Sequence, residues 1–463
     1  MPIAPLLDSP RSKSLTLIAT SLGFAVVQLD VTIVNTALNT ISSALGGGVV
    51  ALQWIVSTYT ITFASFILTA GALGDRVGSK RIFIAGFAIF TIASLACALA
   101  PTLPVLIAAR AVQGIGAAIL VPNSLAVLNH AHRDDKERAH AVGIWAAGAS
   151  FAITAGPLAG GALIAAFGWR SIFLINLPVG LAGLWLAWRY VDETPSSRAR
   201  ELDLPGQAIA ILGLGSLAAG MIEGGAVGWT NRWVIASFAT FVVLLLLFLS
   251  MERRARDPML PLSLFVRRRF TITSIVGLLV NVAFYGLIFV LSLYFQRENE
   301  YSAFKTGLAF APIMIAVFIA NLAAARIVAR FGARATIGAG AALAAMSCAA
   351  LLEIEHGTPY AFIGAQFIGL GAGLGVLVPP LTSMLLGSVE KARSGVASGM
   401  LNSARQTGSV IGVSLFGSLI GGSLGLVSGT RVALVISIGL LAGACIAIFI
   451  GDRRDAPAPA GAR

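Results

Sequence analysis

Long apolar segments dominate this chain of 463 residues, and they constrain its fold more than any other feature. A helix that crosses a bilayer needs roughly 20 mostly apolar residues. Fourteen such segments can be read: 14–38, 50–72, 82–101, 103–128, 139–166, 171–190, 203–223, 233–250, 270–294, 306–329, 335–353, 359–384, 394–420 and 432–451. Only 11% of the residues are charged, against about a quarter in a soluble domain. The sequence therefore predicts an all-α membrane protein with 14 transmembrane helices.

The basic residues are distributed unevenly between the loops, and this predicts an orientation. The formal net charge is +12. With a cytoplasmic N-terminus, 25 of the 32 Lys and Arg residues lie in cytoplasmic segments and five lie outside. The remaining two, Arg110 and Arg405, lie within spans. This asymmetry follows the positive-inside rule. It explains the basic character without nucleic acid, and it predicts a multi-pass protein of the cell (inner) membrane with both termini cytoplasmic.

Several kinds of chemistry lack the residues they need. The three cysteines are far apart in apolar segments, so they offer neither a disulfide framework nor metal-ligand spacing. No P-loop of the form GxxxxGK(S/T) is present, which disfavours ATP-driven transport by this chain alone. No pairing of a nucleophile with a base is apparent either. We therefore expect no enzyme activity, no cofactor and no metal site.

Two local patterns recur in order, 254 and 255 residues apart. Arg-Val-Gly-Ser-Lys at 76–80 matches Arg-Phe-Gly-Ala-Arg at 330–334, and Gly-Ile-Gly-Ala at 114–117 matches Gly-Leu-Gly-Ala at 369–372. The matches indicate that spans 1–6 and 9–14 are two related six-helix bundles, with spans 7 and 8 as an inserted helix pair. Such halves are typical of secondary transporters, in which the substrate lies between them near the midplane.

This repeat predicts the domain organisation. No segment is long enough for a second soluble domain. The predicted parts are a cytoplasmic N-terminal tail (1–13), an N-terminal bundle (14–190), the inserted pair (203–250), a basic cytoplasmic linker (251–269), a C-terminal bundle (270–451) and a disordered cytoplasmic tail (452–463).

Ionisable residues inside the membrane are costly, so each is a functional candidate. Asp30 is the only acid deep within a predicted span. At 1.5 Å per residue it lies roughly 12 Å from the outer end of its span, and Arg110 lies roughly 10 Å from the same side. The two could form a pair if their helices are neighbours. The carboxylate of such a pair could take up and release a proton during transport, which would couple transport to protons. The alternative is that the buried pair has a purely structural role.

The first span also carries a polar stripe. Ser21, Gln28, Thr32, Asn35 and Asn39 share one helix face, and Asp30 lies on nearly the opposite face. We assign the uncharged stripe to a substrate cavity, and we expect Asp30 to contact a neighbouring helix. The alternative is that the stripe only joins helices together.

The thirteenth span has a similar polar face, formed by Ser398, Asn402, Arg405 and Ser409. Arg405 lies near mid-depth, where its partner could be Asp30, backbone carbonyls or a substrate anion. Glu223 lies at the outer end of span 7 and is expected to be an interfacial group.

Several motifs resemble the major facilitator superfamily, specifically its fourteen-span drug:proton antiporter family. They are Leu29–Leu38 in span 1, Gly71–Arg81 after span 2, Arg110–Gly116 with Pro122 in span 4, Gly143 to Gly161 in span 5, Gly168–Gly180 and Ser398–Gln406. Two departures from the family pattern are Asn39, where the family often has Pro, and Ala152, where it has Gly.

The resemblance implies roles for individual residues. Asp30 and Arg110 would couple protons. Together with the polar faces of spans 1 and 13, the resemblance leads us to expect a substrate cavity lined by Gln28, Thr32, Asn35, Trp54, Ser57, Gln113, Asn402 and Arg405. The conformational gate would include Gly71, Asp75, Arg76, Gly78, Lys80, Gly156, Pro157, Gly160 and Gly161.

The resemblance also implies a function, a proton-coupled antiporter that exports hydrophobic small molecules as a monomer in the lipid bilayer by alternating access. Some relatives that export dications carry extra acids in spans 10 or 13. Here span 10 has none and span 13 offers Arg405, so lipophilic monocations or neutral drugs are favoured. The alternatives are a dedicated exporter of a metabolite, antibiotic or lipid-like amphiphile, and a non-transporting membrane sensor.

Overall fold

The computed structural model describes residues 10–132, 134–194, 203–255, 258–354, 358–390, 394–422 and 424–451. Within these residues the chain is helical and contains no strand. Thirteen helices are long and apolar enough to cross a membrane. The prediction of an all-α membrane fold is therefore confirmed, whereas the count of fourteen spans is not. The predicted tail 452–463 and the first nine residues of the predicted tail 1–13 lie outside the described residues.

The helices follow one another along the chain with short connections. In order they are α1 (Pro10–Leu45), α2 (Val49–Val77), α3 (Ser79–Leu99), α4 (Leu103–Ala131), α5 (Asp135–Phe167), α6 (Ser171–Leu174), α7 (Asn176–Tyr190), α8 (Leu204–Val227), α9 (Arg232–Arg254), η1 (Leu262–Val266), α10 (Arg268–Leu293), η2 (Tyr294–Glu298), α11 (Ala303–Phe331), α12 (Ala333–Ala350), η3 (Leu351–Glu353), α13 (Tyr360–Leu386), α14 (Ser394–Gly421) and α15 (Leu426–Gly451).

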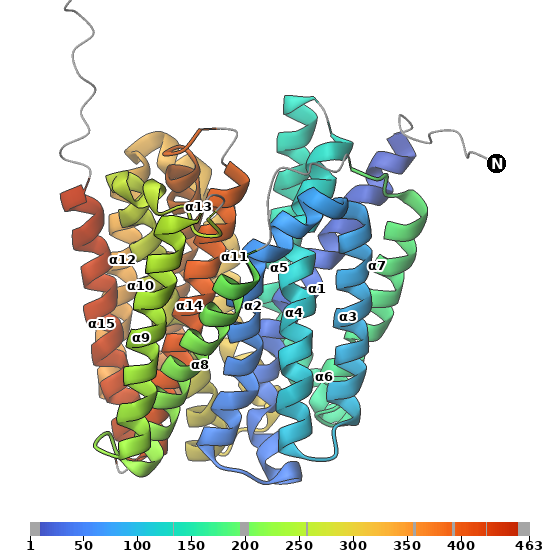
Figure 1. Ribbon diagram of the computed structural model, residues 1–463. Coiled ribbons are helices and arrows are strands. Elements are labelled where there is room, and N and C mark those ends of the chain that lie inside the picture. The colour runs from blue at the N-terminus through green and yellow to red at the C-terminus, as the bar shows by residue number, and fades with distance from the viewer. Residues whose placement is uncertain are drawn as a thin grey trace, which may run out of the picture.

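The helix α1 begins at Pro10, four residues before the predicted span. Its first turns are held by the end of α7, because the hydroxyls of Ser12 and Thr16 donate to the carbonyl of Tyr190 at 3.4 and 3.2 Å. The start of α1 and the end of α15 lie on the same face of the bundle, which we call the terminal face (Figure 1).

The bundle is held by contacts between helices that are close in sequence and between helices that are far apart in it (Figure 1). α1 packs against α4, α5 and α7, and α10 packs against α14 and α15. The first seven helices meet the later ones mainly where α2 contacts α14 and where α5 contacts α11. Side chains reinforce this junction, since the Gln53 amide donates to the carbonyls of Val413 and Ser414 at 3.2 and 2.7 Å.

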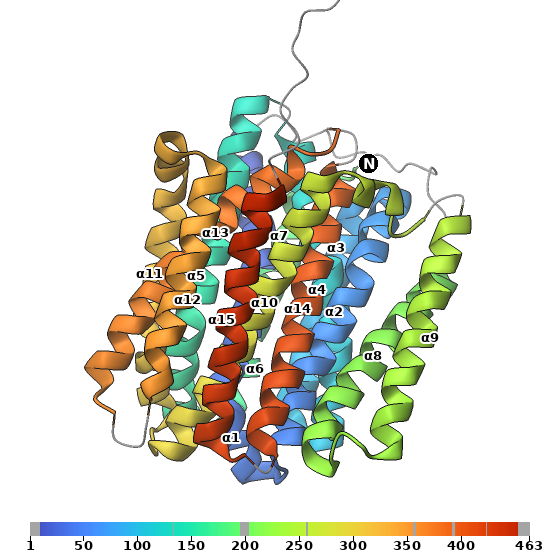
Figure 2. The same ribbon diagram turned by 90° about the vertical axis from the view of Figure 1, so that its left-hand side faces the viewer.

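The helices α8 and α9 lie at the edge of the bundle, beside α2 and α14 (Figure 2). α8 contacts both of these helices, and α9 packs mainly on α8. Only Val234 and Glu252 are buried within α9, although the helix is strongly apolar. A helix that is apolar all round but has few protein neighbours is suited to contact with lipid.

Close helix contact explains one of the glycines of the repeat. A Cβ added at Gly116 of α4 would lie 2.7 Å from the backbone nitrogen of Phe90 in α3. Backbone cannot give way as a flexible side chain can, so these two helices approach closely only because position 116 has no side chain.

Gly116→Ala is expected to lower stability by about 1–3 kcal/mol, because overpacking forces the α3 and α4 backbones apart. Gly443→Ala is the matched control, since no atom lies within 4 Å of a Cβ at that position of α15. Thermal unfolding of the detergent-solubilised protein measures both. Equal midpoints for the two variants would contradict the close α3–α4 contact.

Candidate functional site

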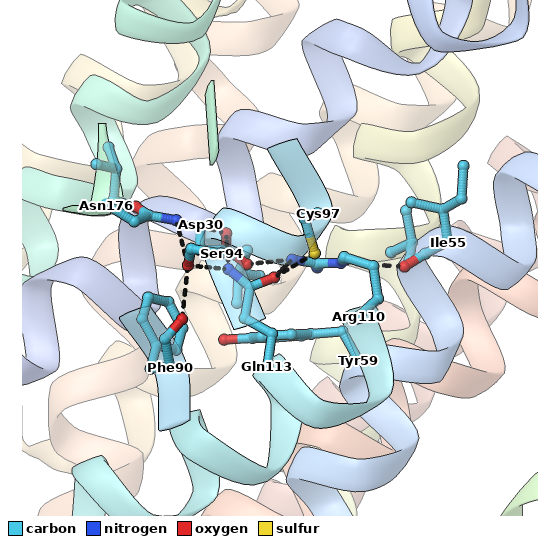
Figure 3. A network of polar contacts seen from close by, with 12 residues as sticks. Asp30, Ile55, Tyr59, Phe90, Ser94, Cys97, Arg110, Gln113 and Asn176 are labelled. Carbon is cyan, nitrogen blue, oxygen red and sulfur yellow. Dashed lines mark hydrogen bonds and ion pairs between the residues drawn. The ribbon is translucent and has the colours of Figure 1, made fainter. Parts of the chain in front are cut away.

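Asp30 of α1 and Arg110 of α4 form an ion pair inside the bundle (Figure 3). The Arg110 Nη1 lies 2.5 Å from the Asp30 Oδ2, and the side chains are 1% and 0% exposed. The sequence left open whether these residues meet, and the structure brings them together. A buried pair needs further hydrogen bonds to offset the desolvation of both charges.

The second carboxylate oxygen receives those hydrogen bonds. The Asp30 Oδ1 accepts from the Gln113 amide at 2.9 Å and from the Asn176 amide at 3.1 Å. Gln113 also accepts from the Arg110 Nη1 at 2.6 Å, so it bridges acid and base. Gln113 was predicted to line the substrate cavity, but the structure places it in this network.

Ser94 of α3 completes the network. Its hydroxyl accepts from Gln113 at 2.8 Å and donates to the carbonyl of Phe90 at 2.7 Å. Helices α1, α3, α4 and α7 therefore meet around one carboxylate (Figure 3). The sequence analysis singled out neither Ser94 nor Asn176 as a site residue. For Asn176 the available signal was its place in the Gly168–Gly180 motif.

Arg110 has neighbours on its other side as well. Its Nε donates to the carbonyl of Ile55 at 3.3 Å. The guanidinium carbon lies 4.2 Å from the centre of the Tyr59 ring and 5.9 Å from that of Phe173. Aromatic faces stabilise a cation that water does not reach. The charge is thus held by an acid, a carbonyl and two rings.

A small cavity, which we call the central cavity, lies where α1, α2 and α4 face α10 and α14. It is lined by Val31, Asn35, Val56, Tyr59, Thr60, Arg110, Tyr285, Ser409 and Val413. Its volume is about 10 Å³, close to the space that a single water molecule needs. Arg110 therefore belongs both to the ion pair and to the cavity wall. Asn35, one of the residues expected in the substrate cavity, lies in this wall, together with the polar residues Tyr59, Thr60, Tyr285 and Ser409.

Other residues predicted for the cavity lie at helix contacts instead. The Thr32 hydroxyl donates to the Ile153 carbonyl of α5 at 3.3 Å, and the Ser57 hydroxyl lies 3.4 Å from that of Ser414 in α14. Trp54 packs against the cluster that includes Ile222 of α8. Linear spacing identified one polar face of α1, but the neighbouring helices decide what each residue on it contacts.

The remaining predicted cavity residues are half-buried. Gln28 is a half-buried residue of α1, and the Asn402 amide donates within its own helix to the Ser398 carbonyl at 3.1 Å. The partner of Arg405 is the hydroxyl of Thr382 in α13, to which its Nη2 donates at 2.7 Å. None of the three options considered from the sequence named this hydroxyl.

The sequence of the chain was compared with known protein families. The sequence matches the Major Facilitator Superfamily over residues 20–413. The chain belongs to this superfamily. It therefore has the fold of a multi-span helical membrane transporter rather than that of an enzyme.

Similar chains are named for drug resistance. The chain is 38% identical over 410 residues to the methylenomycin A resistance protein of Streptomyces coelicolor, covering 89% of this chain and 86% of that one. It is 38% identical over 412 residues to the multidrug resistance protein Stp of Mycobacterium tuberculosis, covering 89% and 76%.

Solved structures agree with the fold. A bacterial homologue of the human lysosomal transporter Spinster, solved in an inward-facing and unoccupied conformation, superposes with a TM-score of 0.70. The match covers 97% of this chain and 100% of that one at 17% identity, so it speaks to the fold alone.

The predicted gate residues of this superfamily member lie in two places. Gly71, Asp75, Arg76, Gly78 and Lys80 lie around the junction of α2 and α3. Gly78 has φ +106°, which favours glycine, and a side chain there would collide with Glu193.

The segment after α7 holds the α2–α3 junction. The backbone N–H of Ser79 donates to the Thr194 hydroxyl at 2.6 Å, and Arg81 pairs with Glu193 at 3.2 Å. Sequence reasoning did not identify these two partners, because they lie more than a hundred positions away along the chain.

The second group of gate residues lies on α5. Gly156 and Gly160 lie against α1, whereas Gly161 and the Pro157 carbonyl lie against α11. The Thr154 hydroxyl also donates to the Met314 carbonyl of α11 at 3.2 Å. α5 therefore contacts both α1 and the later helices through small residues.

Arg110→Ala is expected to destabilise the protein by about 3–5 kcal/mol, because it leaves the Asp30 carboxylate buried without its cation. The double variant Asp30→Asn with Arg110→Met removes both charges and is expected to recover most of that loss. Thermal unfolding in detergent compares the two. A double variant no more stable than Arg110→Ala would show that the unpaired charge is not the cause.

Proposed function

We propose that this chain is a proton-coupled exporter of hydrophobic small molecules that works by alternating access. The observation that carries the proposal is the position of Arg110, which holds the buried Asp30 carboxylate and also lines the central cavity. The names of the relatives, one for methylenomycin A resistance and one for multidrug resistance, support drug efflux as the activity.

Protonation supplies the proposed coupling step. A proton that enters from outside neutralises Asp30, and the ion pair with Arg110 is then lost. The guanidinium is freed at the cavity wall, where it changes both the charge and the packing between α4 and the opposite helices. Release of the proton to the inside restores the pair. The cycle is driven by the proton gradient and needs no cofactor.

The size of the cavity supports alternating access. Ligand pockets for drug-sized molecules occupy about 300–1,000 Å³, far above the roughly 10 Å³ found here. A substrate therefore binds only after α10 and α14 move away from α1 and α2. In this proposal the α2–α3 junction and the glycines of α5 form the conformational gate, and the two halves separate where α5 contacts α11.

The proposed architecture has fourteen spans, with α14 as the additional one. This helix has 28 residues and packs between α10 and α2, and its Ser, Asn, Arg and Gln side chains lower its hydropathy. The two six-helix bundles would then comprise 14–190 and 270–451, with 203–250 as the inserted pair. The excess of basic residues in one set of loops supports cytoplasmic termini at the cell membrane. The proposed transporter acts as a monomer, as the family resemblance implies.

The substrate class follows from the charges near the cavity. No acid lines it among the described residues, and Arg405 lies about one helical turn before the lining residue Ser409 on α14. Lipophilic monocations and neutral drugs fit this environment better than dications. Because methylenomycin A appears in the name of a relative, a dedicated exporter of one antibiotic is the second candidate.

Flux in proteoliposomes tests the coupling. With an imposed pH gradient, the wild type is expected to move fluorescent monocations, and Asp30→Asn is expected to fall to the level of protein-free vesicles. Glu223→Gln, which neutralises a half-buried acid on α8, is expected to retain flux. Unchanged flux in Asp30→Asn would remove this carboxylate from the mechanism. Flux of a single compound from a broad panel would favour the dedicated exporter.

Substrate selection by Arg405 has its own test. Arg405→Gln is expected to raise the transport of dications relative to neutral dyes, because it removes a repelling charge. Thr382→Val removes the hydrogen bond but keeps the charge, so its selectivity is expected to match the wild type. The ratio of initial rates for the two dye classes is the measurement. A shift in Thr382→Val alone would contradict the electrostatic role.

A further inference from the structure

A second cavity, distinct from the central one, lies between the pair α8–α9 and the helices α2 and α14. Its volume is about 160 Å³. Its walls include Ser65 of α2, Ala210 and Leu214 of α8, Phe248 of α9, Met259 of the following segment and Ser403 of α14. We call it the lateral pocket.

The lining of the lateral pocket is almost entirely hydrocarbon. Its polar side chains are Ser65 and Ser403, and the Ser403 hydroxyl already donates to the Ala64 carbonyl at 3.1 Å. If the pocket were empty, its apolar walls would lose the dispersion energy of contact with other atoms. A water molecule in the pocket would form too few hydrogen bonds to be stable there. The chemistry of the pocket therefore selects an apolar occupant.

A single helix separates the pocket from the outer surface of the bundle. α9 forms its outer wall and is exposed along most of its length, for example at Val243 and Leu246, both 62% exposed. Figure 2 shows α8 and α9 at the rim of the bundle, apart from its main body. An acyl chain of the surrounding bilayer therefore needs to pass only one helix to enter.

Basic residues lie at the membrane surface close to the pocket. Arg253 and Arg254 form the last turn of α9 at the terminal face, and both are exposed. They follow the lining residue Phe248 by five and six positions, roughly 8–9 Å along the helix axis. Guanidinium groups bind phosphate through charge-assisted hydrogen bonds. A phosphate at this level would have its acyl chain at the depth of the pocket.

A buried amide lies next to the pocket without a partner for its donor. Gln207 is 4% exposed and precedes Ala210 and Leu214 on the same face of α8. Its Oε1 accepts from the Thr69 hydroxyl at 2.5 Å, but its Nε2 has no hydrogen-bond partner among the described residues. Glycerol ester carbonyls lie between the phosphate and the acyl chains of a phospholipid, and each can accept such a hydrogen bond.

We propose that the lateral pocket binds one acyl chain of an anionic phospholipid from the leaflet at the terminal face, with the lipid phosphate at Arg253 and Arg254. The bound chain fills the space between the inserted pair and α14. It couples the lipid composition of that leaflet to the helix that lines the central cavity through Ser409. The site is separate from the proposed substrate cavity and does not depend on the exported compound.

Lipid retention tests the pocket. The protein is reconstituted in phosphatidylcholine vesicles that contain phosphatidylglycerol, extracted, and examined by native mass spectrometry. Wild type is expected to retain a phosphatidylglycerol adduct. Ala210→Phe fills the pocket and is expected to lose it, whereas Ala208→Phe places the same side chain on the exposed face of α8 and is expected to keep it. Equal retention in both variants would overturn the proposal.

A second variant tests the headgroup without altering the packing. Arg253→Gln with Arg254→Gln is expected to reduce the preference for phosphatidylglycerol over phosphatidylcholine by about tenfold or more. An unchanged preference would overturn the assignment of the phosphate. If Ala210→Phe retained lipid but lost binding of a lipophilic dye, the pocket would be an entry site for exported compounds, and the lipid proposal would fail.

Discussion

A carboxylate and a guanidinium, Asp30 and Arg110, are buried together where the bilayer supplies no water to solvate either charge. Everything around them follows from this constraint. The remaining lone pairs of the acid are satisfied by amides from α4 and α7, and the cation is covered by a carbonyl and by aromatic rings. Because no single helix can supply these partners, α1, α3, α4 and α7 must keep one relative arrangement. Such an ion pair is suited to act as a switch. A single proton on Asp30 would remove the negative charge around which these four helices are arranged.

The ion pair is directly connected to the central cavity. Arg110 is the residue common to the ion pair and to the cavity wall, which faces α10 and α14 on its far side. In the state seen here the wall residues lie close to one another, so a drug-sized molecule would bind there only after they separate. The proposed cycle needs no long-range communication, because the group that responds to the proton already touches the space in which the substrate would bind.

The helices α8 and α9 add a different kind of surface to the superfamily fold. They contact the bundle on one side only and enclose an apolar space beside α2 and α14. In the proposed arrangement lipid surrounds the outer side of α9, so an acyl chain would fill the apolar space behind this helix in preference to water. α14 lines both the central cavity and this space, which places one helix between substrate and lipid.

The sequence by itself determined the class of fold, the approximate position of each helix, and the identity of the buried acid and base at matching depth. These features follow from hydropathy and from the cost of charge in hydrocarbon, both of which act on a single helix. Only the tertiary structure decided which face of each helix meets which neighbour. Thr32 was expected in the cavity from its spacing along span 1, and Ser57 and Gln113 were further candidates. All three lie at helix contacts or in the ion-pair network, and Asn176 and Tyr285 were not identified from the sequence. Spacing along a helix fixes the angles between its own side chains, but their orientation toward other helices depends on the packing of the whole bundle.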